Sequence, residues 1–362
     1  MDKVFSGFWQ TLARPIIGMA PMDGVTDFAC RAITAKHGRP SVMMTEFTTA
    51  TGLFYAPERI LRDFEYSEIE RPVVAQIYGN IPEDFYRAAH VVCELGFDGI
   101  DINMGCPSKA VTQKLCGGRL ITAPDLALEI VRATRNGIHD WASGQTLTDI
   151  KTSAKVIRVI ERMNEGRQFV RKKIPYSVKT RIGYDDVVIE KWVETLLSEK
   201  PAVITVHGRT LKQMYKGLAS WEAIAAAVRV AKGSGTLILG NGDIHSLEEA
   251  HQKIEMSGVD GVLIGRGSMG NPWIFKGHQP TQEERLQVAL EHAALYDKGK
   301  RDFKSIRKHL IGYLSHFKDA AALRHQAIQT HSYEDLKNVL DLTKALPISD
   351  SFHAVSSTAH QS

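Results

Sequence analysis

Short apolar runs alternate with longer amphipathic stretches between about residues 15 and 275 of this chain. The short runs are rich in Val and Ile and nearly continuously apolar, which is typical of strands buried on both faces of a parallel sheet. The amphipathic stretches often begin with a capping residue or proline and end on glycine, as helices do. The predicted strands are residues 16–21, 42–47, 73–78, 99–104, 177–182, 203–207, 237–240 and 261–265. The predicted helices include residues 82–96, 124–137, 220–230 and 246–258.

The regular strand–helix order predicts an α/β fold in which residues 1–276 form a TIM (β/α)8 barrel. A doubly wound parallel sheet is the alternative, because a count of strands does not show that the sheet closes. One connection, residues 138–173, is too long for a single helix. We expect it to hold an inserted surface helix over 146–166, capped by Thr148 or Asp149 and followed by a basic, solvated stretch.

The strand–helix order stops after Phe275. Residues 277–284 are polar and contain proline, which is typical of a linker. Helical spacing then continues through residues 285–348, which predicts a second domain that is an all-helical bundle. Residues 349–362 are rich in Ser, Thr and His, and we expect a flexible tail there.

The composition is ordinary for a soluble globular protein, with 43% hydrophobic and 24% charged residues and a formal net charge of +4. It excludes collagenous, disordered and disulfide-dense proteins. No apolar run reaches the roughly 18 residues that span a bilayer, and the N-terminus does not resemble a signal peptide. Four cysteines in 362 residues indicate free thiols in a reducing compartment. We therefore expect a cytoplasmic protein, monomeric by default and without a metal site.

Polar and glycine residues gather at the carboxyl ends of the predicted strands, which in a barrel meet at the face where sites form. The last two strand ends, LGNGD and IGRG, are glycine-rich and lead into helix-like segments. Such paired turns favour a phosphate site, because glycine lets backbone N–H groups approach an anion. Plain tight turns are the alternative. Neither a Rossmann motif nor a Walker motif occurs in the sequence.

Four side chains at strand ends suit a bound ring system. Lys179 lies inside the apolar strand SVKTRIG, where a cation would stabilise the anionic reduced form of an electron-accepting ring. An ion-paired or snorkelling lysine is the alternative. Gln76 and Asn103 supply fixed hydrogen-bond donors and acceptors. His207 could contact the same ring, transfer a proton, or be an ordinary core histidine.

Cys106 lies in the turn NMGCP at a strand end, which would hold its thiol over the barrel mouth. This position favours an acid or nucleophile over a structural role. Cys30 and Cys93 fall within helix patterns and fit structural roles. Cys116, in LCGG, follows ten residues after Cys106; the pair makes a poor zinc site, and a disulfide is unexpected in the cytosol.

Several motifs together resemble the tRNA-dihydrouridine synthase family in its bacterial form. They are MAPMDGVTD, AQIYG, DINMGCPSK, SVKTRIG, HGRT followed by QMYKG, GNGDI and GVLIGRGSMGNPW. The likeness covers about residues 15–275 and continues weakly into the helical tail at FKSIRKHLIGYL. It implies an FMN-containing barrel with a C-terminal helical domain that binds tRNA.

The resemblance also implies the reaction: an oxidoreductase acting on a CH–CH group reduces selected uridines in tRNA to 5,6-dihydrouridine. NADPH would reduce FMN, flavin N5 would pass hydride to uracil C6, and Cys106 would give a proton to C5. A free thiol, with a pKa of about 8.5, keeps its proton at pH 7 and is a workable acid. The implied cofactor-binding residues are Pro21, Met22, Asp23, Gln76, Lys179, His207, Asn241, Gly242, Asp243, Gly265 and Arg266. Asn103 and Arg181 would lie near the flavin or the uracil.

The helical tail carries an electrostatic signal for RNA. Between residues 298 and 318 seven basic residues stand against one acid, Asp302. Arg301, Lys304 and Lys308 have the i, i+3, i+7 spacing of one helix face, so we expect them to bind tRNA phosphates. A merely solvated basic helix is the alternative.

Two other functions fit parts of the pattern. An FMN-dependent small-molecule pyrimidine oxidoreductase, of the dihydroorotate or dihydropyrimidine dehydrogenase type, would share the barrel without needing a basic helical domain. A non-catalytic RNA-binding protein would contain no flavin. The chain also departs from the family pattern in its long insert and in Cys116, where Ala or Gly is more familiar.

Overall fold

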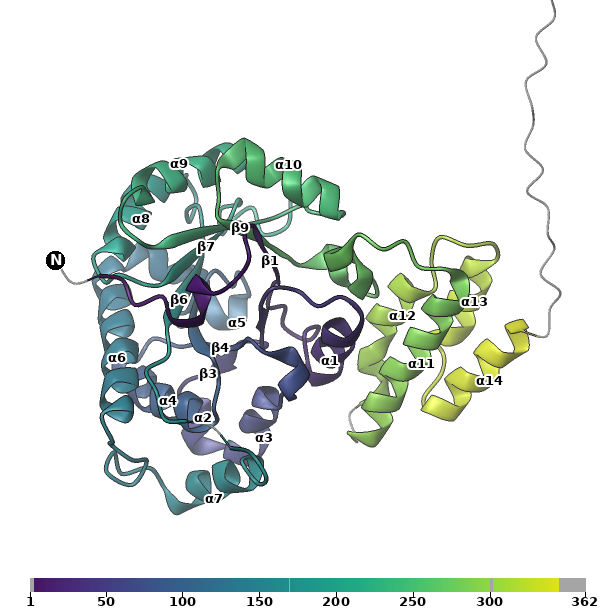
Figure 1. The fold of residues 1–362 in the computed structure, drawn as a ribbon, viewed down its shortest axis with the longest axis horizontal. Helices are drawn as coiled ribbons and strands as arrows, with labels where there is room; N and C mark the ends of the chain where they lie inside the picture. The colour runs from purple at the N-terminus through teal and green to yellow at the C-terminus, as the bar shows by residue number, and fades with distance from the viewer. Residues whose placement is uncertain (1–2, 169, 300–301, 345–362) are drawn as a thin grey trace, which may run out of the picture. The chain divides into compact units, whose positions relative to one another are not determined.

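Parallel strands follow one another around the first unit of the chain (Figure 1). The sheet runs β1 (Ile16–Met19), β9 (Gly261–Ile264), β8 (Leu237–Asn241), β7 (Val203–His207), β6 (Tyr176–Arg181), β5 (Gly99–Met104), β4 (Val73–Tyr78) and β2 (Met43–Met44), with β3 (Thr48–Thr49) also paired to β4. The structure is a computed structural model that describes residues 3–168, 170–299 and 302–344. The chain divides into two compact units, residues 1–281 and residues 282–362.

The sheet closes between β1 and β2. The N–H of Met19 donates to the carbonyl of Val42 at 2.9 Å, and the N–H of Ser41 donates to the carbonyl of Ile17 at 2.8 Å. β2 and β3 both pair with β4 and share one place in the ring, so the nine strands occupy eight positions. The predicted (β/α)8 barrel is therefore confirmed, and the doubly wound alternative is wrong.

Helices follow the strands and cover the outside of the barrel. Asp27, Ser220 and Ser246 cap three of them by accepting backbone N–H groups at 3.0–3.1 Å. The longer helices are α1 (Phe28–His37), α4 (Pro82–Glu94), α6 (Pro124–Ala142), α8 (Ile189–Leu197), α9 (Trp221–Ala231) and α10 (Leu247–Ser257). Short helices α2 (Gly52–Tyr55), α3 (Pro57–Ile60) and α5 (Lys109–Thr112) lie in the connections.

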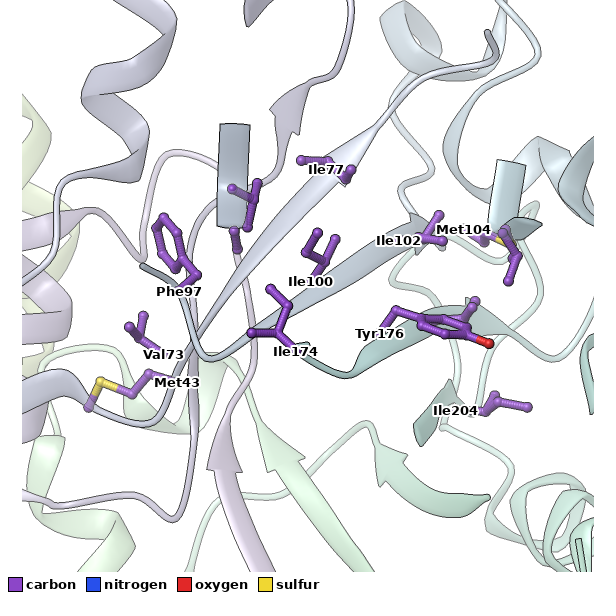
Figure 2. Close-up of a cluster of buried hydrophobic side chains, with 14 of the residues drawn as sticks. Met43, Val73, Ile77, Phe97, Ile100, Ile102, Met104, Ile174, Tyr176 and Ile204 are labelled. Atoms are coloured by element: carbon purple, nitrogen blue, oxygen red, sulfur yellow. The ribbon is translucent and has the colours of Figure 1, made fainter. Parts of the chain in front are cut away.

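Alternate residues of each strand face opposite sides of the barrel wall. Ile100, Ile102 and Met104 of β5 lie in the buried apolar cluster shown in Figure 2. Asp101 and Asn103, between them, face the barrel interior. The interior has its own apolar cluster, formed by Ile16, Ala20, Val42, Met44, Val74, Ala202, Val203, Leu239, Leu263 and Trp9 of the 3₁₀ helix η1 (Gly7–Gln10).

The insert before β6 lies at the amino ends of the strands, because it leads directly into the start of β6. Its helix α7 (Ala154–Met163) buries Val156, Val159 and Ile160. The predicted cap was wrong: Ser153 caps α7, whereas Asp149 accepts hydrogen bonds from Thr146 in a separate turn. That turn ends at Lys151, whose φ is +55°, so the helix does not continue through it.

The basic stretch after α7 is only partly a solvated face. Arg167 donates to the carbonyl of Tyr66 at 2.7 Å and stacks 4.2 Å from its ring. Arg171 likewise lies 4.4 Å from the Trp141 ring. Lys172 is exposed. The two arginines therefore fasten the insert to the barrel, at the face opposite to the carboxyl ends of the strands.

The second unit is helical where it is described. It contains α11 (Gln282–Lys298), η7 (Phe303–Ile306), α12 (Arg307–Tyr313), α13 (Ala320–Ala327) and α14 (Tyr333–Lys344), which confirms the all-helical prediction. Lys304 lies on the 3₁₀ helix η7 and Lys308 on α12, which follows it directly, so the predicted basic face stays a prediction. Lys304 is exposed and Lys308 half-buried, while Arg301 lies outside the described residues. Among the described helices of the chain, none is long and apolar enough to cross a membrane.

A buried ion pair joins α1 to the loop before β4. Arg31 Nε and Glu70 Oε2 are 2.7 Å apart, and both side chains are fully buried. Arg31 also donates to the carbonyl of Thr26 at 2.7 Å, and Glu70 accepts from the N–H of Ser67 at 2.8 Å. Removing one partner would leave an uncompensated charge in the core.

We predict that Glu70→Ala lowers the free energy of unfolding by about 3–5 kcal/mol, the usual cost of breaking a buried pair. Urea unfolding followed by circular dichroism measures this change. Glu68→Ala is the matched control, since Glu68 pairs with Arg71 while its side chain is 68% exposed. Its effect should stay within about 1 kcal/mol, and equal losses in the two variants would contradict the prediction.

Candidate active site

A cavity of about 560 Å³ opens at the carboxyl ends of the barrel strands. Its volume lies within the range of small-molecule and cofactor pockets, about 300–1,000 Å³. The site residues that the sequence predicts in the barrel all line it: Pro21, Met22, Asp23, Gln76, Asn103, Cys106, Lys179, Arg181, His207, Asn241, Gly242, Asp243, Gly265 and Arg266. Their strands are parallel, so residues far apart in the sequence meet at one rim.

Two buried amides form one wall of the cavity. Gln76 on β4 is fully buried, and Asn103 on β5 is 6% exposed. The Asn103 Nδ2 donates to Gln76 Oε1 at 2.9 Å. Gln76 Nε2 in turn donates at 2.7 Å to Asp101, whose side chain is fully buried beneath the cavity.

The turn after β5 presents Cys106 to the cavity. Asn103 Oδ1 accepts the N–H groups of Gly105 at 3.1 Å and Cys106 at 2.9 Å, which holds this turn. Burial raises the pKa of the Cys106 thiol, although a backbone hydrogen bond from Ser108 opposes the rise. The thiol is therefore protonated at neutral pH.

The segment around Cys116 is tightly packed, although it contains two consecutive glycines. Cys116 is 4% exposed and begins the 3₁₀ helix η4 (Gly117–Thr122). A Cβ at Gly117 would lie 3.0 Å from the Cys106 carbonyl oxygen, and one at Gly118 would lie 2.1 Å from Leu211. The two glycines thus let this segment pack directly against the Cys106 turn. All four cysteines are free thiols.

Lys179 brings a positive charge to the cavity. Its Nζ donates to Asn241 Oδ1 at 3.1 Å, which leaves further N–H groups on the same ammonium. Burial, followed by the charge of Arg181, lowers the pKa of Lys179 to about 8, while Asp101 and Cys106 oppose the change. The ammonium therefore predominates at pH 7.

Arg181 is mainly committed to neighbouring loops. Its Nε donates to the carbonyl of Gly105 at 2.7 Å, and its Nη1 donates to Thr210 and Met214 carbonyls at 3.0 Å. Burial lowers the pKa of Arg181 to about 10, so the guanidinium remains charged. The side chain joins the Cys106 turn to the loop after β7.

His207 is neutral in this site. Burial, followed by the charges of Lys179, Arg181 and Arg209, lowers the pKa of His207 to about 2. Its Nε2 lies 3.2 Å from Nη1 of Arg209, which can only donate. The ring proton is therefore assigned to Nδ1, and His207 can donate a neutral hydrogen bond but is not an imidazolium acid.

Arg209 is a site residue that the sequence-based prediction missed. It is 2% exposed, and its Nη2 donates to both carboxylate oxygens of Asp243 at 2.6 and 2.8 Å. Arg266 Nη2 reaches the same carboxylate at 3.1 Å. Although burial favours its neutral form, hydrogen bonds from Arg209 and the N–H of Ala219 lower the pKa of Asp243. The Asp243 carboxylate is thus paired with two arginines. As an anion it would not contact a phosphate directly.

Two glycines in the turns after β8 and β9, Gly242 and Gly267, have no room for a side chain. Gly242 has φ +130°, and a Cβ there would lie 2.6 Å from Ala219 and 3.2 Å from His207. A Cβ at Gly267 would lie 2.4 Å from the carbonyl oxygen of Ile244, so the two turns touch backbone to backbone. Beside them the Arg266 side chain is 53% exposed. This arrangement suits an anionic group.

Three further residues belong to the site without having been predicted. Asp101 lies in the buried and mostly apolar strand GIDINM. A carboxylate at such a position was the available signal in the sequence. Met214 and Tyr215 line the cavity from the loop after β7, and both are largely exposed. The sequence signal for these two residues was the motif QMYKG, which contains both of them and follows HGRT. Among the described residues, no cluster of three or more His, Cys, Asp and Glu side chains could hold a metal ion.

The fold and the cavity define a (β/α)8 barrel protein with a cationic site at the carboxyl ends of its strands. A family model described as dihydrouridine synthase matches residues 18–152 and 148–347. The probable tRNA-dihydrouridine synthase of Staphylococcus aureus (strain COL) is 35% identical over 346 residues, which cover 92% of this chain and 94% of that protein. Probable tRNA-dihydrouridine synthase 2 of Bacillus subtilis (strain 168) is 32% identical over 345 residues, covering 92% and 95%. The chain belongs to the dihydrouridine synthase family, which confirms the resemblance seen in its motifs.

The chain also has a more distant likeness to a solved structure. A structure of DHODH from Eimeria tenella in complex with ferulenol is 13% identical, covers 83% of this chain and 87% of that chain, and has a TM-score of 0.49.

We predict that iodoacetamide modifies Cys106 before the other three cysteines, which are all buried. The thiolate is the reacting form, so the rate should still be rising above about pH 8.5, the pKa of a free thiol. Timed alkylation with peptide mass spectrometry measures both points. Equally fast labelling of Cys116, or a rate that levels off below pH 8, would contradict an accessible Cys106 thiol with a raised pKa.

Proposed function

We propose that this protein reduces selected uridines in tRNA to 5,6-dihydrouridine, with FMN as its cofactor and NADPH as the reductant. One observation carries the proposal: Cys106 and Lys179 line a single cavity in a member of the dihydrouridine synthase family. The names of the bacterial relatives supply the substrate class, tRNA.

The cavity residues fit FMN as a phosphate-bearing ring. Lys179, Arg181, Arg209 and Arg266 outnumber the acids Asp23 and Asp243 in the cavity lining, so the site favours a ligand with negative charge. The Arg266 side chain and the backbone of the turns Asn241–Asp243 and Gly265–Arg266 would hold the phosphate. Pro21, Met22, Gln76 and Lys179 would hold the ring. When bound, FMN supplies the hydride that the uracil ring accepts.

Cys106 would hold the proton that uracil C5 takes up when the C5–C6 double bond is reduced. Burial keeps its thiol protonated at neutral pH, and the hydrogen bonds from its turn to Asn103 fix its position. Positioned general acids typically accelerate reactions by about 10²–10⁴. A thiol suits this task because a free thiol has a pKa of about 8.5. Burial raises the pKa of Cys106 further, so its proton is in place at neutral pH.

Two neighbours of the thiol would stabilise negative charge that develops on the rings. Lys179 contributes an ammonium in a low-dielectric site, where such a charge acts strongly. His207 contributes a neutral N–H donor, since burial and then the surrounding cations lower its pKa and keep it unprotonated. Both side chains line the same cavity as Cys106.

Mapping dihydrouridine in tRNA tests the proposal directly. Cells that lack this protein should lose dihydrouridine at one or more tRNA positions, and the intact gene should restore it. Unchanged dihydrouridine at every position would sink the proposal and favour an enzyme that acts on small pyrimidines.

We predict that Cys106→Ala still binds FMN, accepts electrons from NADPH and binds tRNA, but reoxidises about 10²–10⁴ times more slowly with tRNA. Stopped-flow absorbance of the pre-reduced enzyme mixed with tRNA measures this step. Cys116→Ala is the matched control, because Cys116 is buried outside the cavity lining and should leave the rate near wild type. Equal rates in the Cys106 variant and the wild type would show that Cys106 is not the general acid.

We predict that Lys179→Met weakens FMN binding or slows FMN reduction, because it removes the cation beside the ring. Burial lowers the pKa of Lys179 to about 8, so the ammonium loses its proton as the pH rises through that value. Wild-type affinity for FMN should therefore fall above about pH 8, and the variant should lack this decrease. Fluorescence titration of FMN at several pH values measures it. Identical profiles would reject Lys179 as a ligand.

We predict that Lys304→Gln with Lys308→Gln weakens tRNA binding and flattens its salt dependence, because each phosphate contact adds to the slope. Filter binding between low and moderate salt gives that slope. Lys172→Gln is a control, since Lys172 is exposed at the opposite end of the barrel strands from the cavity. NADPH oxidation should not change in either variant, and an unaltered slope would remove Lys304 and Lys308 from the RNA-binding surface.

A further inference from the structure

A directed chain of hydrogen bonds leads from the Cys106 turn down into the barrel. The N–H of Cys106 donates to Asn103 Oδ1 at 2.9 Å. Asn103 Nδ2 donates to Gln76 Oε1 at 2.9 Å, and Gln76 Nε2 donates to Asp101 Oδ2 at 2.7 Å. Every bond in this chain points away from the cysteine and toward Asp101. The proposed function gives Asp101 no role.

Asp101 is the only charged member of the chain, and it is enclosed. Its side chain is fully buried, and its second oxygen accepts the hydroxyl of Ser177 on β6 at 2.6 Å. Gln76 lies directly across from it on β4 in the strand register. Asp101 is thus held from both neighbouring strands, and its two oxygens face one donor each.

An ionised carboxylate only accepts hydrogen bonds, which orients the amide groups of the chain. Gln76 must turn its nitrogen toward Asp101, so its oxygen faces Asn103. Asn103 must then turn its nitrogen toward Gln76, which leaves its oxygen for the Cys106 turn. The reversed arrangement would set oxygen against oxygen at Asp101 and N–H against N–H at Cys106.

The same constraint decides what the cavity presents to a ligand. Each amide nitrogen carries a second N–H, and both Gln76 and Asn103 line the cavity. Asn103 Oδ1 already accepts two N–H groups and Gln76 Oε1 accepts one, so the groups left for the ligand are mainly donors. This wall therefore suits the acceptor edge of a ring.

We propose that Asp101 is a positioning residue that acts through Gln76 and Asn103, holding the turn that carries the Cys106 thiol and directing both amide N–H groups toward the cavity. The consequence for proton transfer rests on the proposed function, whereas the consequence for the thiol's environment does not. Bonds in such a chain polarise one another, so the charge at its buried end strengthens the bond at Cys106.

The ionisation of Asp101 agrees with this role. Burial raises the pKa of Asp101 to about 6, while hydrogen bonds from Ser177 and Gln76 and the charge of Lys179 oppose the rise. At pH 7 and above the carboxylate therefore predominates, and the chain keeps its direction.

Alkylation of Cys106 by iodoacetamide tests the proposal on the full-length protein without cofactor or tRNA. Asp101→Leu removes the acceptor at the end of the chain, so the turn should loosen and the thiol pKa should fall toward that of a free thiol. Near pH 8 the alkylation rate should then rise about threefold, which corresponds to half a pKa unit. Circular dichroism at the same temperature confirms that the variant is folded.

A swapped pair separates the hydrogen-bond chain from the fold. In Asp101→Asn with Gln76→Glu, the new amide donates to the new carboxylate, which still accepts from Asn103, so Cys106 should react as in the wild type. Ser177→Ala is the matched control: it removes a bond to Asp101 that lies outside the chain and should leave the rate unchanged. If Asp101→Leu does not fold, Gln76→Leu interrupts the chain one residue earlier and should give the same faster alkylation.

The proposal is overturned if Cys106 reacts at the wild-type rate in folded Asp101→Leu or Gln76→Leu, or if the swapped pair reacts as fast as Asp101→Leu. Turnover with tRNA provides the second readout: kcat of Asp101→Leu should drop about 10–100-fold, as losses of supporting partners do elsewhere, with KM for tRNA unchanged. A wild type that forms no dihydrouridine would defeat the proposed function and leave the alkylation result standing. An active wild type with unchanged alkylation in the variants would defeat only the role of Asp101.

Discussion

The closed parallel barrel requires each inward-facing side chain to find partners inside a space that water barely enters. At the amino ends of the strands this requirement is met by apolar packing, with Trp9, Ile16 and Val203 in one cluster. Nearer the carboxyl ends polar residues face inward, and a buried polar group is costly unless it is hydrogen-bonded. Gln76 and Asp101 satisfy one another across the sheet, and the turn of the reactive thiol is built on top of them.

The cationic side chains of the site are arranged so that few of them are free. Arg181 is held by three backbone carbonyls, and Arg209 is held by Asp243. These fixed charges add to the burial that keeps His207 neutral, and two arginines surround the Asp243 carboxylate. Lys179 and Arg266 retain unused donors for a ligand. The site thus combines immobilised charges, which determine its electrostatic potential, with a smaller number of groups that can bind a ligand.

The insert contains a run of basic residues whose roles cannot be inferred from the sequence alone. Its arginines occur in a basic run, yet Arg167 and Arg171 stack on aromatic rings and donate to backbone carbonyls. They stabilise the face at the amino ends of the strands. In (β/α)8 barrels that face serves stability, while the opposite face carries the site.

The sequence by itself determined the order of strands and helices, the barrel, and which residues stand at the strand ends. It could do so because parallel strands are apolar and short, and because their carboxyl ends must share one rim. Only the tertiary structure decided how the side chains at that rim pair. Cys116 and its glycines proved to be tightly packed, and Asp243 proved to hold arginines, because Leu211 and Arg209 approach them from distant parts of the chain. Asp101 was hidden for the same reason: hydrogen-bond direction depends on neighbours across the sheet, and a single strand does not reveal them.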